Sequence, residues 1–335
     1  MSTLFPEYRT PPCITRHPAN PVLTASQVPY PSSLVFNAGV VKQTDRYVMV
    51  FRNDYKPKGQ PELKGTNLGL AFSPDGIAWT VEPEPCWALR DHEISRAYDP
   101  RLTVIENEIY MCFALDTAHG VRGGIARTTD FHDFEILSLS VPDNRNMVLF
   151  PEKIDGMYVR LERPFPVYSR GGRELFDVWI SRSPDLVYWG DSELVLGVEH
   201  VPFANNKIGP AAPPIRTEDG WLTLFHAVHV DPTRGKNGWE DSWTKWYAAG
   251  VMLLDLDNPA IVKGMSTSPV LVPEARCETT GGYRNNVIFP TGVTIENGGV
   301  LRMYYGAADT VMCVAEASIQ ELVGLCTESP VPRHA

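Results

Sequence analysis

Residues 68–79, Leu-Gly-Leu-Ala-Phe-Ser-Pro-Asp-Gly-Ile-Ala-Trp, and residues 177–189, Asp-Val-Trp-Ile-Ser-Arg-Ser-Pro-Asp-Leu-Val-Tyr-Trp, follow one pattern. In both, an apolar run typical of a β-strand ends in Ser-Pro-Asp, and a tryptophan stands four residues after the aspartate. Residues 124–134 vary this pattern, with Thr-Thr-Asp before a phenylalanine. Aspartate is a common turn residue, and the aromatic residue begins a further strand. Recurrence of this pattern indicates a fold built from copies of one small β-sheet.

Two further strand-like runs precede this pattern in each copy. A unit starts at a polar or proline-containing stretch, passes a turn, and reaches the end of its second strand 15 residues later, as from Asn37 to Arg52. Five units of three to four strands are typical of a five-bladed β-propeller. The predicted unit starts are Asn37, Asp99, Phe150, Gly209 and Phe289.

We therefore predict an all-β, five-bladed β-propeller that occupies residues 1–335 as a single domain. An N-terminal arm covers about residues 1–30 and a C-terminal tail about residues 326–335. Helical periodicity is confined to residues 318–325 and to a turn or two near residues 93–96. A β-sandwich is the alternative, but it does not predict a polar residue that recurs at the start of the innermost strand.

Composition narrows the possible functions. The 335 residues include 40 acidic and 30 basic side chains, and the net charge of −10 argues against sequence-independent binding of nucleic acid. No run of 18 apolar residues is present, so we expect no membrane span, and the first residues do not have the pattern of a signal peptide. The six cysteines form no C-x-x-C pair, which favours free thiols in the cytoplasm over disulfides or a zinc site.

The start of each unit and the end of its second strand meet at one mouth of the central channel in a propeller. Polar groups buried there lose free energy unless they are paired or bind a ligand. We therefore expect a small polar ligand such as a sugar, against which aromatic side chains can stack. The channel positions hold Asn37, Arg52, Asp99, Arg163, His226, Tyr305 and Asp309.

Asp99 is the first candidate for chemistry. It lies in Tyr98-Asp-Pro-Arg101, where the following proline keeps its neighbourhood extended at the start of a strand. An aspartate that caps a turn fits the same residues, so both interpretations stand at this point.

A scattered set of cations is the second candidate. Each of these side chains alone also fits a solvated or salt-bridged residue, but together they would form a phosphate site. His226 and His229 would face opposite sides of a strand, so a zinc pair is not expected. The set consists of Arg145, Arg163, Lys207 and His226.

Six stretches carry a family resemblance: Phe36-Asn-Ala-Gly39, Phe51-Arg52-Asn53, Tyr98-Asp-Pro-Arg101, Arg160-Leu-Glu-Arg-Pro164, Ile208-Gly-Pro210 and Tyr304-Tyr-Gly-Ala-Ala-Asp309. In this order they resemble glycoside hydrolase family 130, the β-mannoside phosphorylases and β-mannosidases. The resemblance covers about residues 15–325 and implies a five-bladed β-propeller, in agreement with the repeat count.

The resemblance also implies roles for single residues. Asp99 matches the catalytic acid, which protonates the glycosidic oxygen through the 3-hydroxyl of the mannose, while phosphate attacks C1 and yields α-mannose 1-phosphate. The implied phosphate-binding residues are Arg145, Arg163, Lys207, His226 and Tyr247. The implied sugar-binding residues are Asn37, Arg52, Tyr98 and Asp309.

The expected reaction is phosphorolysis of β-mannosides, with β-1,4-mannosyl-N-acetylglucosamine or β-1,4-manno-oligosaccharides as substrates. Inorganic phosphate is the co-substrate, and we expect no cofactor and no metal. A β-mannosidase that uses water and a non-catalytic glycan-binding propeller remain alternatives. We expect a homo-oligomer, and the loop of residues 231–245, with Trp239 and Trp243, could contact either an acceptor sugar or a second copy.

Overall fold

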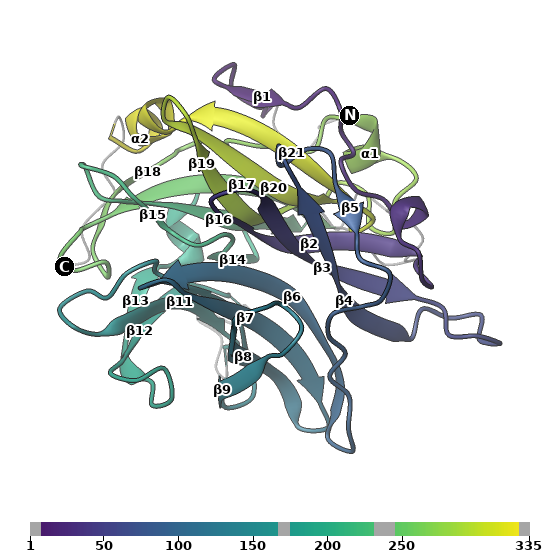
Figure 1. The fold of residues 1–335 in the computed structure, drawn as a ribbon. Helices are drawn as coiled ribbons and strands as arrows, with labels where there is room; N and C mark the ends of the chain where they lie inside the picture. The colour runs from purple at the N-terminus through teal and green to yellow at the C-terminus, as the bar shows by residue number, and fades with distance from the viewer. Residues whose placement is uncertain (1–7, 167–174, 231–244, 328–335) are drawn as a thin grey trace.

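The computed structural model describes residues 8–166, 175–230 and 245–327, and its strands form five separate antiparallel sheets. Figure 1 shows how the sheets follow one another along the chain, from the purple and blue strands to the yellow ones. The expected all-β, five-bladed β-propeller is thereby confirmed. The proposed extent of the single domain, residues 1–335, stays a prediction, because both ends of the chain lie outside the described residues.

Each of the first three blades consists of four consecutive strands. Blade 1 contains β2 (Leu34–Lys42), β3 (Tyr47–Tyr55), β4 (Gly65–Ser73) and β5 (Thr80–Val81). Blade 2 contains β6 (Ile94–Ile105), β7 (Glu108–Thr117), β8 (Gly120–Thr128) and β9 (Glu135–Leu139). Blade 3 contains β10 (Asn144–Leu149), β11 (Tyr158–Pro164), β12 (Val178–Ser183) and β13 (Gly190–Leu196).

The last two blades complete the ring. Blade 4 contains β14 (Lys207–Pro210), β15 (Ile215–Arg216), β16 (Trp221–Val230), β17 (Lys245–Leu254) and β18 (Val262–Met265). Blade 5 contains β19 (Ile288–Glu296), β20 (Val300–Ala307) and β21 (Val311–Ser318). Its outermost strand is β1 (Ile14–Arg16), which pairs with β21, so residues near the start of the chain close the propeller (Figure 1).

Short helices connect the strands. Two single 3₁₀ turns span Ala25–Gln27 and Val198–His200, and helix α1 (Arg276–Thr279) precedes blade 5. Helix α2 (Ile319–Thr327) follows β21, where helical periodicity was expected. No helix among the described residues has the length and apolar character needed to cross a membrane.

The Ser-x-Asp turn that recurs in the sequence forms the same hydrogen bonds in three blades. In blade 1, Asp75 Oδ1 accepts from the N–H groups of Ile77 and Ala78 at 2.8 Å each, and Ser73 Oγ accepts from the N–H of Gly76 at 2.8 Å. These bonds supply the turn with its own local stabilisation. They recur at Thr128 and Asp130 in blade 2 and at Ser183 and Asp185 in blade 3.

A β-bulge interrupts the innermost strand of blades 1, 2 and 3 at equivalent positions. One residue of each bulge has left-handed backbone geometry: φ is +51° at Asn37, +55° at Asp99 and +59° at Asn146. Asn and Asp tolerate this geometry better than other non-glycine residues, and a bulge redirects the side chain that it carries. Three polar side chains are thereby redirected at the same level of the channel.

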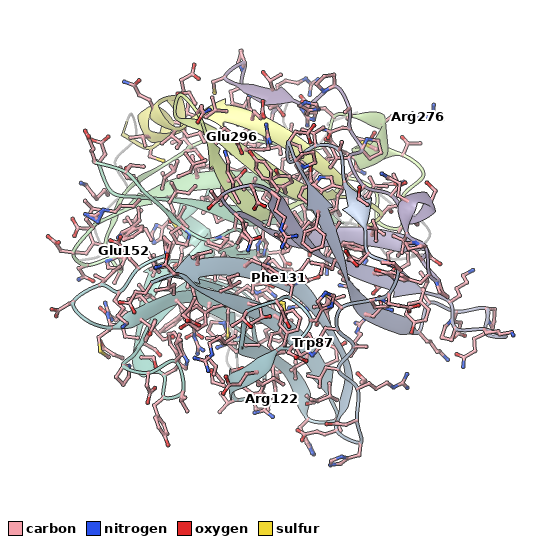
Figure 2. The ribbon with its side chains drawn as sticks, in the orientation of Figure 1. Trp87, Arg122, Phe131, Glu152, Arg276 and Glu296 are labelled. Carbon is pink, nitrogen blue, oxygen red and sulfur yellow. The ribbon has the colours of Figure 1, made fainter. Side chains whose placement is uncertain are left out.

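The hydrophobic core lies between neighbouring blades. One cluster joins Val50 and Leu70 of blade 1 to Met111 and Phe113 of blade 2, and similar clusters join blade 3 to blade 4 and blade 4 to blade 5. Figure 2 labels Phe131 and Trp87, which belong to the first of these clusters or pack against it. Contacts between blades therefore stabilise the ring that holds the channel.

Two local predictions are wrong. The third unit begins with β10 at Asn144, six residues before the predicted start at Phe150. The Phe-Pro pair of residues 150–151 follows the inner strand of its blade, whereas the pair of residues 289–290 lies within one. Residues 94–96 form the start of β6 rather than a helical turn, because Ile94 pairs with Thr117 on β7.

Candidate active site

A cavity of about 320 Å³ lies where the five blades meet, and every blade contributes side chains to it. Its lining includes seven arginine or lysine side chains and three aspartates, although the chain as a whole has a net charge of −10. A cleft with such an excess of positive charge attracts anions. Nine of the ten predicted site residues line it: Asn37, Arg52, Tyr98, Asp99, Arg145, Arg163, Lys207, Tyr247 and Asp309.

Asp99 is held by two neighbouring side chains of blade 1. Its Oδ1 accepts hydrogen bonds from Asn37 Nδ2 at 3.0 Å and from Arg52 Nη1 at 3.1 Å. Arg52 is in turn held by Asp54, whose Oδ2 lies 2.6 Å from Arg52 Nη2. Asp99 Oδ2 has no hydrogen-bond partner among the described residues, so one oxygen of this carboxylate is available to a ligand in the cavity.

Arg101 lies directly behind Asp99 and is almost completely buried. Its Nη1 donates to the backbone carbonyl of Asp99 at 3.1 Å, and its Nε donates to that of Ala211 at 2.7 Å. The first bond stabilises the left-handed backbone conformation of Asp99. The second links blade 2 to the residue that follows β14 in blade 4.

The charges around Asp99 favour its ionised form. Burial alone would raise the pKa of this carboxyl, but the guanidinium groups of Arg52 and Arg101 and the hydrogen bond from Asn37 outweigh burial and hold the pKa below its ordinary value. Asp99 is therefore a carboxylate at neutral pH when no anion is bound.

Asp309 differs from Asp99 in its ionisation. It follows Ala308 in the tight turn between β20 and β21, where both residues have left-handed backbones, and its Oδ2 pairs with Arg284 Nη1 at 3.1 Å. Burial raises the pKa of Asp309, and the negative charge of Asp99 raises it further, against the opposing effect of Arg284. The two carboxyls are thus unequal, with Asp309 the more readily protonated.

Three basic side chains, Arg145, Arg163 and Lys207, line the cavity without a carboxylate partner among the described residues. Aromatic rings lie beside them instead: Phe165 lies 5.5 Å from the guanidinium carbon of Arg145 and 5.7 Å from that of Arg163. Phe176 lies 5.3 Å from Lys207 Nζ. Arg163 Nε and Nη2 and Arg145 Nε are buried without a hydrogen-bond partner. Unpartnered buried donors are costly, so this group of atoms is suited to an anion with several acceptor oxygens.

Mutual repulsion in this group changes the ionisation of Lys207 and Arg163. Burial, and then the positive charges of Arg163, Lys245 and Arg145, lower the pKa of Lys207 to about 6. Burial and Arg145 lower the pKa of Arg163 to about 9. A bound anion would oppose both effects, because it places negative charge among these groups.

His226 lies behind the cavity lining and is completely buried. Its Nε2 lies 3.2 Å from Arg163 Nη1. Since a guanidinium only donates, Nε2 accepts, and the ring is the neutral tautomer with its proton on Nδ1. Burial and Arg163 lower the pKa of His226, consistent with a neutral ring. A direct bond from His226 to phosphate stays a prediction, whereas its contact with Arg163 is present in the structure.

Several residues of the cavity were not predicted. Asn146 stands in blade 3 where Asp99 stands in blade 2, since Arg145-Asn146 and Tyr98-Asp99 both begin a bulge, but the two pairs share no residue that a sequence pattern could use. Arg284 lies in an irregular segment before β19 and has no comparable signal in the sequence. Tyr305, which was expected at the channel mouth, is instead buried and donates to Glu278 Oε1 at 2.8 Å.

Within the described parts of the chain, three or more His, Cys, Asp or Glu side chains are nowhere grouped as a metal site would require. The expectation that the protein uses neither metal nor cofactor stays a prediction. The loop of residues 231–244, with its two tryptophans, lies outside the described residues.

Comparisons with known proteins point to one family. A family model described as glycoside hydrolase 130, beta-1,4-mannooligosaccharide phosphorylase, matches residues 12–328. Beta-1,4-mannooligosaccharide phosphorylase from Ruminococcus albus is 33% identical over 92% of this chain and 90% of its own length. Beta-1,2-mannobiose phosphorylase from Listeria innocua is 33% identical over 76% of this chain and 67% of its own length. A solved structure of beta-1,2-mannobiose phosphorylase from Listeria innocua, in complex with beta-1,2-mannobiose, is similar with a TM-score of 0.79 and 28% identity, covering 93% of this chain and 98% of that one.

Proposed function

The chain belongs to glycoside hydrolase family 130 and is a glycoside phosphorylase, and from this premise we propose that it cleaves β-1,4-linked mannosides with inorganic phosphate. The products are α-mannose 1-phosphate and the shortened sugar. β-1,4-Mannosyl-N-acetylglucosamine and β-1,4-manno-oligosaccharides are the proposed substrates. The Ruminococcus albus relative, which is named for the β-1,4 linkage, supports this choice because it matches nearly the whole chain.

The observation that carries the proposal is the group of cations in the same cavity as Asp99. Arg145 and Arg163 present buried donors without a partner, Lys207 lines the same cavity, and no described carboxylate neutralises this group. A hydrolase that uses water has no need for such a group, whereas phosphate supplies the acceptor oxygens and negative charge that it lacks. We assign phosphate to these three residues together with Tyr247 and with His226, which holds Arg163 in place.

In the proposed reaction, a phosphate oxygen attacks the anomeric carbon of the mannose from the face opposite the leaving group. The bond from that carbon to the glycosidic oxygen breaks, and its electron pair leaves with the oxygen. Asp99 supplies the proton for this oxygen through the 3-hydroxyl of the mannose. One displacement inverts the configuration, so a β-mannoside gives the α-phosphate.

A single free acid is sufficient for this chemistry. Inverting hydrolases use a second carboxylate to activate water, but phosphate is already a nucleophile. In the cavity, both oxygens of Asp54 accept hydrogen bonds from Arg52, whereas Asp99 Oδ2 and Asp309 Oδ1 have no partner among the described residues. Of these two carboxyls we take Asp99 as the acid, because it matches the catalytic acid of the family and Asp309 pairs with Arg284. We assign the mannose to Asn37, Arg52, Tyr98 and Asp309, which line the same cavity as Asp99.

Phosphate also provides the acid with its proton. Asp99 is held ionised in the free protein, and a bound dianion raises its pKa because it counteracts Arg52 and Arg101. The proton that hydrogen phosphate carries becomes acidic once the ester has formed and can return to Asp99. Protons and charges therefore balance over one turnover without a further acid or base.

The test is to incubate the protein with β-1,4- and β-1,2-linked mannobiosides, with and without phosphate, and to measure mannose 1-phosphate. We expect mannose 1-phosphate from the β-1,4 substrates only when phosphate is present. Free mannose without phosphate would identify a β-mannosidase, and binding without turnover would identify a glycan-binding propeller. A preference for the β-1,2 substrates would retain the phosphorylase and change the linkage. The cytoplasmic location and the homo-oligomer expected from the sequence stay predictions.

A further inference from the structure

A line of hydrogen bonds runs from the rim of the cavity to the proposed phosphate cations. Arg96 Nε donates to Asp116 Oδ2 at 2.7 Å, and Tyr98 Oη donates to Asp116 Oδ1 at 2.7 Å. Arg145 Nη1 then donates to Tyr98 Oη at 3.3 Å. Asp116 itself is not part of the cavity lining, and neither the sequence pattern nor the family resemblance assigned it a role.

The chemistry of the four groups fixes the direction of every bond. Guanidinium groups only donate and a carboxylate only accepts, so the single proton of the Tyr98 hydroxyl must point toward Asp116. The lone pairs of Tyr98 Oη are then left for Arg145. Asp116 thereby makes this hydroxyl an acceptor on the side that faces the phosphate cations.

The surroundings hold this arrangement in place. The ring of Tyr98 lies near two guanidinium groups, with its centre 4.7 Å from the guanidinium carbon of Arg52 and 4.9 Å from that of Arg96. Asp116 on β7 occupies the position that Asp54 occupies on β3 of blade 1. Each aspartate pairs with the inner-strand residue three positions before the left-handed residue of the bulge. In blade 1 the aspartate binds Arg52, whereas in blade 2 it binds Arg96 and reaches Arg145 through Tyr98.

We propose that Asp116 is a positioning residue for phosphate, which fixes the hydroxyl of Tyr98 as an acceptor and so orients the Arg145 guanidinium. This inference rests on the proposed function, because it assumes that phosphate binds at Arg145. Among the described residues, the Tyr98 hydroxyl is the hydrogen-bond partner of the Arg145 guanidinium. The Nε of Arg145 is buried without a hydrogen-bond partner. Without Asp116, the hydroxyl proton is free to turn toward Arg145, where a donor would face a donor.

The experiment measures the affinity for inorganic phosphate by titration calorimetry, without any sugar, in the wild type, Asp116→Ala, Tyr98→Phe and the double variant. We expect each single variant to bind phosphate about tenfold more weakly, the loss typical of one hydrogen bond to a charged group. The double variant should bind no more weakly than Tyr98→Phe, because Asp116 has no hydroxyl left to orient. In phosphorolysis, Asp116→Ala should raise the KM for phosphate and leave kcat at saturating phosphate largely unchanged.

Glu135→Ala is the matched control. It removes a carboxylate that pairs with Arg127 on the outer part of the same blade, with Nη2 to Oε2 at 2.6 Å, away from the cavity lining. Its phosphate affinity should equal that of the wild type, so a general effect of lost ion pairs in blade 2 would be visible.

Unchanged phosphate affinity in either Asp116→Ala or Tyr98→Phe would overturn the inference, as would a double variant whose loss is the product of the two single losses. Tyr98→Phe preserves the packing of the ring, so it gives an answer even if Asp116→Ala does not fold. A wild type that binds no phosphate would refute the proposed function and this inference with it. Normal phosphate binding in Asp116→Ala refutes the inference alone.

Discussion

Phosphate binding should take up one proton above pH 7, and Lys207 should be the group that accepts it. In the free protein, burial and then the charges of Arg163, Lys245 and Arg145 lower the pKa of this lysine to about 6. At pH 8, about 1% of Lys207 therefore carries a proton. Phosphate binds an ammonium group far better than an amine, and its own charge favours the protonated form.

The size of the effect follows from this pKa. When the pH lies above the pKa of free Lys207 and above the pKa of phosphate, each further pH unit weakens phosphate binding about tenfold. This factor corresponds to about 1.4 kcal/mol of binding free energy. The same shift affects folding. Between pH 6 and the ordinary value of 10.5, the unfolded chain holds a proton on this lysine that the folded protein lacks. The contribution of Lys207 to stability therefore rises with pH over that range and is least favourable below it.

Titration calorimetry of inorganic phosphate at pH 8, in two buffers with different ionisation enthalpies, measures the proton uptake directly. We expect close to one proton per phosphate in the wild type and much less in Lys207→Met, which should also bind phosphate more weakly. Tight phosphate binding at pH 8 with no proton uptake would refute this reasoning. Uptake that persists unchanged in Lys207→Met would assign the proton to another group, with Asp99 the first to examine.

Three further predictions concern other residues. Asp99→Asn should lower the rate of phosphorolysis by about 10²- to 10⁴-fold without lowering the melting temperature, and near-native turnover would contradict its role as the acid. Arg163→Ala should raise the KM for phosphate about 10- to 100-fold, since a hydrogen bond to a charged group is worth about 1.5–3 kcal/mol; unchanged phosphate kinetics would make this arginine structural. Glu278→Ala should destabilise the fold by about 3–5 kcal/mol, as measured by urea unfolding, because Glu278 is buried and binds both Arg16 and Tyr305; a loss below 1 kcal/mol would contradict this.

The strand-ending turns of the propeller could be predicted because their stabilisation is local. Asp75 and Ser73 bind backbone groups no more than three residues away, so the sequence pattern contains every partner. The start of the third unit could not be found in this way. Two identical Phe-Pro pairs occupy different places in their blades, and Asn146, which corresponds to Asn37 and Asp99 in the inner strand of its blade, is recognised by its left-handed backbone in a bulge. That geometry depends on how β10 pairs with β11, which lies beyond the local sequence.

The chemical types of the site residues were predictable from the sequence motifs, but their charge states depend on contacts between blades. Lys207 has a lowered pKa because it is buried and because arginines of blade 3 lie near it, and no spacing along the chain reveals either feature. The same holds for Asp116, whose effect on Arg145 passes through a third side chain.

One difference inside the site is nevertheless readable from the sequence. Arg52 and Arg163 occupy equivalent places, since each lies opposite the residue that precedes a bulge asparagine. Side chains two positions apart on a strand share a face, so each arginine has the residue two positions later as a neighbour. That neighbour is Asp54 for Arg52, which it neutralises, and Phe165 for Arg163, beside whose ring the charge stays uncompensated. At this repeated position, blade 1 has Asp54 and blade 3 has Phe165. This one difference explains why Arg52 holds the acid, whereas Arg163 is left to bind an anion.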